Sequence, residues 1–137
     1  MKKLLIIASL ALSASASAAA ATVQVKIDGV RNDKGVVQVA LCDEATYPKD
    51  CRLTASAPAK TGSVTVDVPN VPAGTWAALA YHDENSDKKL DTNFVGIPKE
   101  GYGFSNGAKG TFGPPKFKDT AITVGEGAST ATITLKY

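Results

Sequence analysis

Apolar and polar residues alternate along much of the chain, and this alternation is the main indication of its secondary structure. In residues 22–28, Val23, Val25 and Ile27 are separated by polar residues. Successive side chains of a strand point to opposite faces, so a period of two predicts a strand with one buried face. The same pattern recurs at residues 37–41, 63–68, 122–124 and 131–137.

Residues 74–82 differ, because they are apolar at both odd and even positions. Their length and the flanking turn residues favour a central strand covered on both faces over a buried helix. Proline and glycine interrupt any long helix elsewhere. We therefore predict an all-β fold with one domain at residues 22–137, an antiparallel β-sandwich of about seven strands, immunoglobulin-like or prealbumin-like. A small open barrel is the second choice.

The first two predicted strands are joined by the polar segment 31–35, which ends in Gly35. Two alternating strands joined by a short turn are typical of a β-hairpin. We therefore expect these strands to pair with each other, with Gly35 at a positive φ angle.

The N-terminus has the pattern of a secretory signal peptide. Lys2 and Lys3 precede an apolar run at residues 4–12 and small residues at 13–21. The apolar run is about half the ~20 residues that cross a bilayer. We expect a signal peptide at residues 1–18, cleaved after Ala18 or at a site up to Ala21, no membrane span, and a periplasmic or secreted protein.

Cys42 and Cys51 are the two cysteines of the chain. In an oxidising compartment, two cysteines of a small domain are more often bonded than free. Their spacing does not match the redox motif with two intervening residues, and a single histidine leaves a zinc site short of ligands. We predict a structural disulfide bond.

Composition argues against several classes of function. Without Lys2 and Lys3, basic and acidic residues number 13 each, so no surplus of positive charge attracts nucleic acid or an anionic membrane. No serine or free cysteine stands in a recognisable nucleophile motif. We expect no nucleic-acid partner and no catalytic triad.

Oxygen-bearing side chains recur at alternate positions after residue 82, an arrangement that suits the hard Ca²⁺ ion. Lys88 stands where an EF-hand loop has glycine and Phe94 where it has a bidentate glutamate, so the segment is not an EF-hand. The alternative is a tight turn whose side chains accept backbone hydrogen bonds without any ion. The candidate Ca²⁺ ligands are Asp83, Asn85, Asp87, Lys89 through its carbonyl, and Asp91.

A long connection with several aromatic residues follows, up to residue 117. Connections of more than about 12–15 residues without regular structure are often functional. The alternative is that the aromatic rings fold back over the core. The predicted binding surface consists of His82, Glu100, Tyr102, Phe104, Ser105 and Asn106.

Several motifs together resemble one family. They are residues 72–76 (Pro-Ala-Gly-Thr-Trp), 82–85 (His-Asp-Glu-Asn), 90–93 (Leu-Asp-Thr-Asn), the long motif 96–106 and residues 113–117 (Gly-Pro-Pro-Lys-Phe). Over residues 22–137 the chain resembles exported bacterial proteins catalogued as the domain of unknown function number 2141. The resemblance implies a sandwich similar to transthyretin-like and carboxypeptidase-regulatory domains, and it carries over no activity and no catalytic residues.

These observations favour an exported, non-enzymatic binding or accessory module whose partner is a protein, a glycan or a small molecule. A second hypothesis is a small metal-assisted hydrolase or isomerase in which His82 and Glu100 act as an acid–base pair. A third is a structural domain whose acidic loop is held by Ca²⁺, the one candidate cofactor.

Overall fold

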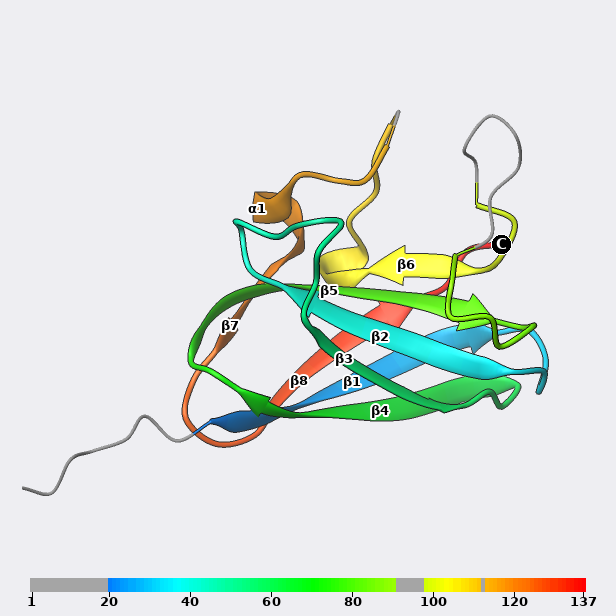
Figure 1. Cartoon of the computed structure of the whole chain (residues 1–137), viewed down its shortest axis with the longest axis horizontal. Coiled ribbons are helices and arrows are strands. Elements are labelled where there is room, and N and C mark those ends of the chain that lie inside the picture. The colour runs from blue at the N-terminus through cyan, green and yellow to red at the C-terminus, as the bar shows by residue number, and fades with distance from the viewer. Residues whose placement is uncertain (1–19, 91–97, 112) are drawn as a thin grey trace, which may run out of the picture.

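The computed structural model describes residues 20–90, 98–111 and 113–137 (Figure 1). Within these residues, a 3-10 helix η1 (Ser105–Gly107) and a short helix α1 (Phe117–Thr120) are the two helical elements. The strands are β1 (Ala21–Val30), β2 (Val36–Cys42), β3 (Leu53–Pro58), β4 (Gly62–Val71), β5 (Gly74–Asp83), β6 (Tyr102–Phe104), β7 (Ala121–Val124) and β8 (Ser129–Thr134).

The strands form two sheets that pack face to face. Sheet A has the order β4-β1-β8, and sheet B has the order β3-β2-β5-β6, with β7 also paired to β5. Strand pairs are antiparallel except for β1 and β8, which are parallel. The sheets do not close into a barrel (Figure 1), so the predicted all-β sandwich is confirmed.

The core lies between the sheets and consists of the inward-facing residues of the alternating strands. Val23, Val25 and Ile27 of β1 are fully buried, as are Val37 and Leu41 of β2. Burial of an aliphatic side chain of this size contributes about 1.5–3 kcal/mol. These strands therefore form because each buries one apolar face against the opposite sheet.

The predicted hairpin of the first two strands is wrong. Strand β1 pairs with β4 and β8, whereas β2 pairs with β3 and β5, so residues 31–35 connect one sheet to the other. Alternation does not distinguish these arrangements, because the apolar faces of two strands are buried equally well side by side or opposite each other. Gly35 does have a positive φ angle, 66°.

Strand β5 is the predicted central strand, and it pairs with β2 along one edge. Its other edge is divided, because β7 pairs with residues 74–77 and β6 with residues 79–81. The expected long connection without regular structure is therefore interrupted by β6, η1 and α1. Strand β6 has only three residues, and β3 is rich in alanine and serine, so neither shows a strong β pattern in the sequence.

The predicted disulfide bond joins Cys42 to Cys51, whose Cα atoms are 4.4 Å apart. It closes a loop at the end of β2. The Tyr47 hydroxyl in this loop donates a hydrogen bond to the Pro115 carbonyl at 2.5 Å, and its ring meets the edge of Phe117 at 5.7 Å. The loop therefore packs on the segment around α1.

Among the described residues, no helix has the length and apolar character needed to cross a membrane. The predicted signal peptide, residues 1–18, lies outside the described residues and stays a prediction.

Substitution of Gly35 tests the connection between the sheets. A Cβ atom here would collide with the Asp83 carbonyl oxygen, in addition to the strain of a positive φ angle. Gly127→Ala is the matched control, because Gly127 has a φ of 88° and nothing within 4 Å of the added atom. We expect Gly127→Ala to lower the free energy of unfolding by about 1–2 kcal/mol, and Gly35→Ala by at least about 1 kcal/mol more. Chemical denaturation measures both, and equal losses would contradict the close contact.

Candidate functional site

The outer face of sheet B carries a row of large side chains. Leu79 and Tyr81 alternate along β5 with Ala78 and Ala80 of the core, so they point away from it. In the register of the sheet, Leu79 is opposite Phe104 and Tyr81 is opposite Tyr102. All four side chains are half-buried.

The rings of Tyr102 and Phe104 meet edge to face, with centroids 6.2 Å apart. In Figure 1 the disulfide loop and the segment after η1 lie above the edge of sheet B that β5 and β6 form. The predicted aromatic part of the binding surface is therefore a partly sheltered face of the sheet, and its rings do not enter the core.

Three carboxyl groups converge beyond Tyr81, at the end of β5. Oxygen atoms of Asp83, Asp87 and Glu100 all lie within 4.8 Å of one another. Asp83 is fully buried and Glu100 is 6% exposed, whereas Asp87 is exposed. Two buried carboxyl groups and one exposed group thus form one cluster of oxygen atoms.

Backbone amides position this cluster. The Asp83 carboxylate accepts hydrogen bonds from the amides of Asp87 at 3.1 Å and Lys88 at 2.8 Å. Glu100 accepts one from the amide of Glu84 at 2.8 Å. The chain turns tightly here, with Lys88 at a φ of 63°. Lys88 thus has the backbone conformation that glycine adopts most readily, at the position where an EF-hand loop has glycine.

The five predicted Ca²⁺ ligands are only partly brought together. Asp83 and Asp87 belong to the cluster, whereas Asp91 lies outside the described residues. Asn85 contacts Asp87 through two hydrogen bonds of 3.4 Å, and the Lys89 amide donates to Asp87 at 2.9 Å. The backbone-bonded turn offered as the alternative is therefore present.

Glu100 completes the cluster, although the sequence assigned it to the binding surface instead. It lies 17 residues after Asp83, so no local spacing pattern marks the two as neighbours. Such a pair is recognisable only once the pairing of β5 with β6 is known.

His82 belongs to the interior and not to a binding surface. Its side chain is fully buried, on the same side of β5 as Ala80. The ring Nε2 lies 2.7 Å from the Lys34 carbonyl, which must accept, so Nε2 carries a proton. The ring Nδ1 lies 2.7 Å from the Tyr137 hydroxyl. Both ring nitrogens are thus engaged within the protein.

A network of side chains that the sequence did not reveal surrounds His82. The Tyr137 hydroxyl accepts a hydrogen bond from the Arg31 amide at 3.1 Å and also lies 2.7 Å from Nδ1 of His82. The Arg31 guanidinium lies over the Tyr137 ring at 4.4 Å and donates from Nε to Glu84 at 2.7 Å. Burial raises the pKa of Tyr137 above 10.0.

Ser105 and Asn106 stabilise the divided edge of β5. The buried Ser105 hydroxyl accepts a hydrogen bond from the Ala78 amide at 3.1 Å and donates to the Thr120 carbonyl at 2.5 Å. Asn106 donates to the Ala121 carbonyl at 3.0 Å. Ser105 therefore takes the place of a strand partner between β6 and β7.

Of the six residues predicted to form a binding surface, His82 and Ser105 are fully buried and Glu100 nearly so. The other three reach solvent: Tyr102 and Phe104 are half-buried, and Asn106 is exposed. Fewer residues of the predicted binding surface therefore reach solvent than the sequence suggested.

Comparison with known proteins identifies a family. The family model described as uncharacterized protein conserved in bacteria, DUF2141, matches residues 25–132. No curated protein and no solved structure matches the chain. The expected likeness to transthyretin-like and carboxypeptidase-regulatory sandwiches therefore stays a prediction.

Tyr137→Phe tests the network around His82. Loss of the hydroxyl leaves the buried Nδ1 without its partner, so we expect the free energy of unfolding to fall by about 1–3 kcal/mol. Tyr102→Phe is the matched control, because within the described residues no hydrogen bond holds the Tyr102 hydroxyl. Chemical denaturation at neutral pH measures both variants.

The pH dependence of the same variant gives a second readout. Because burial raises the pKa of Tyr137, the stability from its neutral hydroxyl is complete below pH 10.0 and is lost as pH rises through the raised pKa. Wild-type protein should therefore lose more stability above pH 10.0 than Tyr137→Phe does. Parallel alkaline curves would contradict this role.

Proposed function

The chain belongs to the DUF2141 family, and from this premise we propose that it is an exported, non-enzymatic binding module. Its contact surface is the outer face of sheet B around Tyr102 and Phe104. A Ca²⁺ ion held by Asp83, Asp87 and Glu100 fixes the adjoining loop. The partner is a protein, glycan or small molecule that meets this face.

The observation that carries the proposal is the burial of two carboxyl groups within 4.8 Å of each other and of a third. Carboxylates taken out of water at this distance repel one another, and the desolvation penalty of a buried ion is several kcal/mol. A cation among them offsets both costs. Ca²⁺ accepts ligand sets made only of oxygen atoms.

Ion binding at this position would act on the contact surface. Asp83 ends β5, and Glu100 lies two residues before Tyr102, the first residue of β6. An ion bound to both would fix the approach to β6, and with it the ring pair of Tyr102 and Phe104. This joins the expected calcium-held loop to the expected binding face in one site.

The geometry of His82 supports a non-enzymatic role. A general base must reach the proton it removes, within hydrogen-bond distance of a substrate. The His82 ring is fully buried, and both of its nitrogens are bonded to protein atoms. The hydrolase or isomerase hypothesis, which requires His82 and Glu100 to meet at an open cleft, therefore receives no support from this arrangement.

Two further features are consistent with export. The disulfide bond between Cys42 and Cys51 is of the kind that persists in oxidising compartments. The N-terminal sequence has the basic, apolar and small-residue regions of a signal peptide.

Thermal and chemical unfolding with Ca²⁺ tests the ion site. For an affinity in the range of extracellular sites, about 10⁻⁴–10⁻³ M, about 10 mM Ca²⁺ should raise the free energy of unfolding by roughly 1.4–2.7 kcal/mol over the value in chelator. The increase should vanish in Glu100→Gln and in Asp83→Asn.

Glu126→Gln is the matched control, because this exposed glutamate lies in the connection from β7 to β8 and outside the cluster. It should keep the full response to Ca²⁺. For each variant, the free energy of unfolding in Ca²⁺ is compared with that in chelator. This difference is needed because removal of a repelling carboxylate changes stability even without any ion. No response in wild-type protein, or the same response in Glu100→Gln, would contradict the Ca²⁺ site.

Substitution on the outer face tests the contact surface. The double variant Tyr102→Ala and Phe104→Ala should lose cross-linking to components of a periplasmic extract by at least about tenfold, since half-buried aromatic residues dominate such interfaces. Trp76→Ala controls for stability, because Trp76 is a half-buried aromatic residue near the other end of β5. Equal losses of cross-linking in both variants would indicate a general effect on folding.

A further inference from the structure

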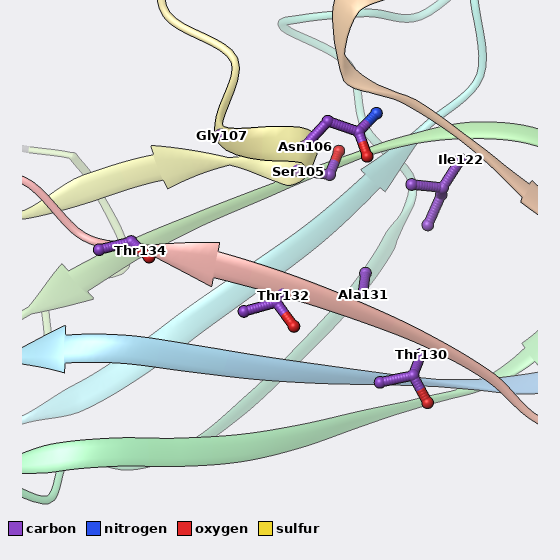
Figure 2. Close-up of a pocket in the computed structure, with 8 residues that line it drawn as sticks. All are labelled: Ser105, Asn106, Gly107, Ile122, Thr130, Ala131, Thr132 and Thr134. Carbon is purple, nitrogen blue, oxygen red and sulfur yellow. The ribbon is translucent and has the colours of Figure 1, made fainter.

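Hollows of different chemistry lie on the described part of the surface. One of about 370 Å³ lies between β8 and η1 and is lined mainly by threonine, serine and asparagine, with no charged residue (Figure 2). Another, of about 230 Å³, combines apolar walls with a charged rim, and we refer to it as the end pocket. Its apolar lining consists of Leu41, Leu53, Pro72 and Trp76, and its charged residues are Asp43 and Arg52.

The end pocket is an opening at one end of the core, between the two sheets. Leu41 of β2 is opposite Leu53 of β3, and Trp76 alternates along β5 in step with Ala78 of the core. These side chains therefore belong to the inward face of sheet B. Leu41 is fully buried, whereas Leu53 and Trp76 are half-buried and pack on the core. Pro72, which follows β4 of sheet A, lines the pocket as well. An apolar group that enters here extends the core.

Local hydrogen bonds hold the wall and the rim in place. The indole Nε1 of Trp76 donates to the Pro72 carbonyl at 2.9 Å. The Asp43 carboxylate accepts hydrogen bonds through Oδ1 from the amide and the hydroxyl of Thr46, at 2.9 and 2.8 Å. Groups that are fixed before a ligand arrives lose little freedom on binding, so the pocket is preorganised.

The rim carries one charge of each sign. Hydrogen bonds from the Thr46 hydroxyl and amide lower the pKa of Asp43, and the nearby Arg52 guanidinium adds to this effect, so Asp43 is ionised at neutral pH. Among the described residues, none forms an ion pair or a hydrogen bond with the Arg52 side chain. Asp43 repels a ligand that carries only a carboxylate, and Arg52 repels one that carries only an ammonium group. A zwitterion is attracted by both.

We propose that the end pocket binds a free α-amino acid with an uncharged aliphatic side chain. The side chain lies against Trp76 and the two leucines, the ammonium group meets Asp43, and the carboxylate meets Arg52. A volume of about 230 Å³ is that of roughly eight water molecules. It suits an amino acid the size of leucine and is too small for tryptophan. The pocket lies at the opposite end of β5 from Asp83, so the proposal does not depend on the function proposed above.

The test titrates the ¹⁵N-labelled full chain with leucine. Trp76 is the only tryptophan, so its indole N–H gives a single NMR signal that reports on the wall of the pocket. We expect a saturable shift of this signal and of the Arg52 amide, and none at Tyr102. Because exposed ion pairs contribute little, the expected dissociation constant is about 1–5 mM. Absence of a saturable shift at about 50 mM leucine would overturn the proposal.

Three compounds are matched controls for the ligand. 4-Methylpentanoate is leucine without the ammonium group, 3-methylbutylamine is leucine without the carboxylate, and glycine keeps both charges without the side chain. The first two should bind at least about threefold more weakly than leucine, and glycine at least about tenfold more weakly. If either singly charged compound binds as tightly as leucine, the pocket does not recognise a zwitterion and the proposal is wrong.

Arg52→Gln supplies a test on the protein side. This variant should bind leucine at least about threefold more weakly and should not weaken the binding of 3-methylbutylamine, which has no carboxylate. Lys49→Gln is the matched control, because Lys49 is an exposed cation of the same loop that does not line the pocket, and it should leave leucine affinity unchanged. Equal weakening of both ligands in Arg52→Gln would contradict the proposed role of Arg52. If this variant does not fold, the comparison of ligands still decides the question.

Discussion

The pleat of β5 couples the core of the sandwich to its outer face. Ala78, Ala80 and His82 point inward. The alternate residues Leu79, Tyr81 and Asp83 point to the outer face. The adjacent residues His82 and Asp83 thus have different roles: the histidine contacts Lys34 and Tyr137 from two other segments of the chain, and the carboxylate anchors the acidic turn. A shift of β5 by one position would exchange these faces, placing a carboxylate in the core and a histidine in the turn, so the register of this strand determines both the fold and the candidate site.

Local patterns of apolar and polar residues were sufficient to predict the sandwich, most of its strands and the central strand, because each is specified by which side chains must leave water. Alternation was insufficient wherever the outcome depends on which strands meet. The pairing of β1 with β4 and β8, instead of β2, is a choice between two ways of burying the same residues. Strand β6 was missed because its three residues are held by their neighbours in the sheet and not by their own pattern.

The candidate site, too, could be predicted only as far as it depends on local sequence spacing. The alternating oxygen ligands of the turn were visible in the sequence, and two of them do converge. Glu100 approaches only through the pairing of β6 with β5, and the partners of His82 come from the connection after β1 and from the C-terminal residue Tyr137. Contacts between residues this far apart in the chain depend on the topology of both sheets, which no local pattern encodes. A lone histidine beside carboxylates therefore suggested chemistry, although its surroundings give it a structural role.

The divided edge of β5 has a consequence for how this domain tolerates change. Strands β6 and β7 are separately anchored to β5, and Ser105 fills the gap between them. The stretch between η1 and α1 leaves the sheet and returns to it at two independently fixed points. Changes in the length or composition of this stretch therefore need not disturb the pairing of β6 or β7 with β5. It is a suitable place for sequence variation or for insertion of a foreign epitope.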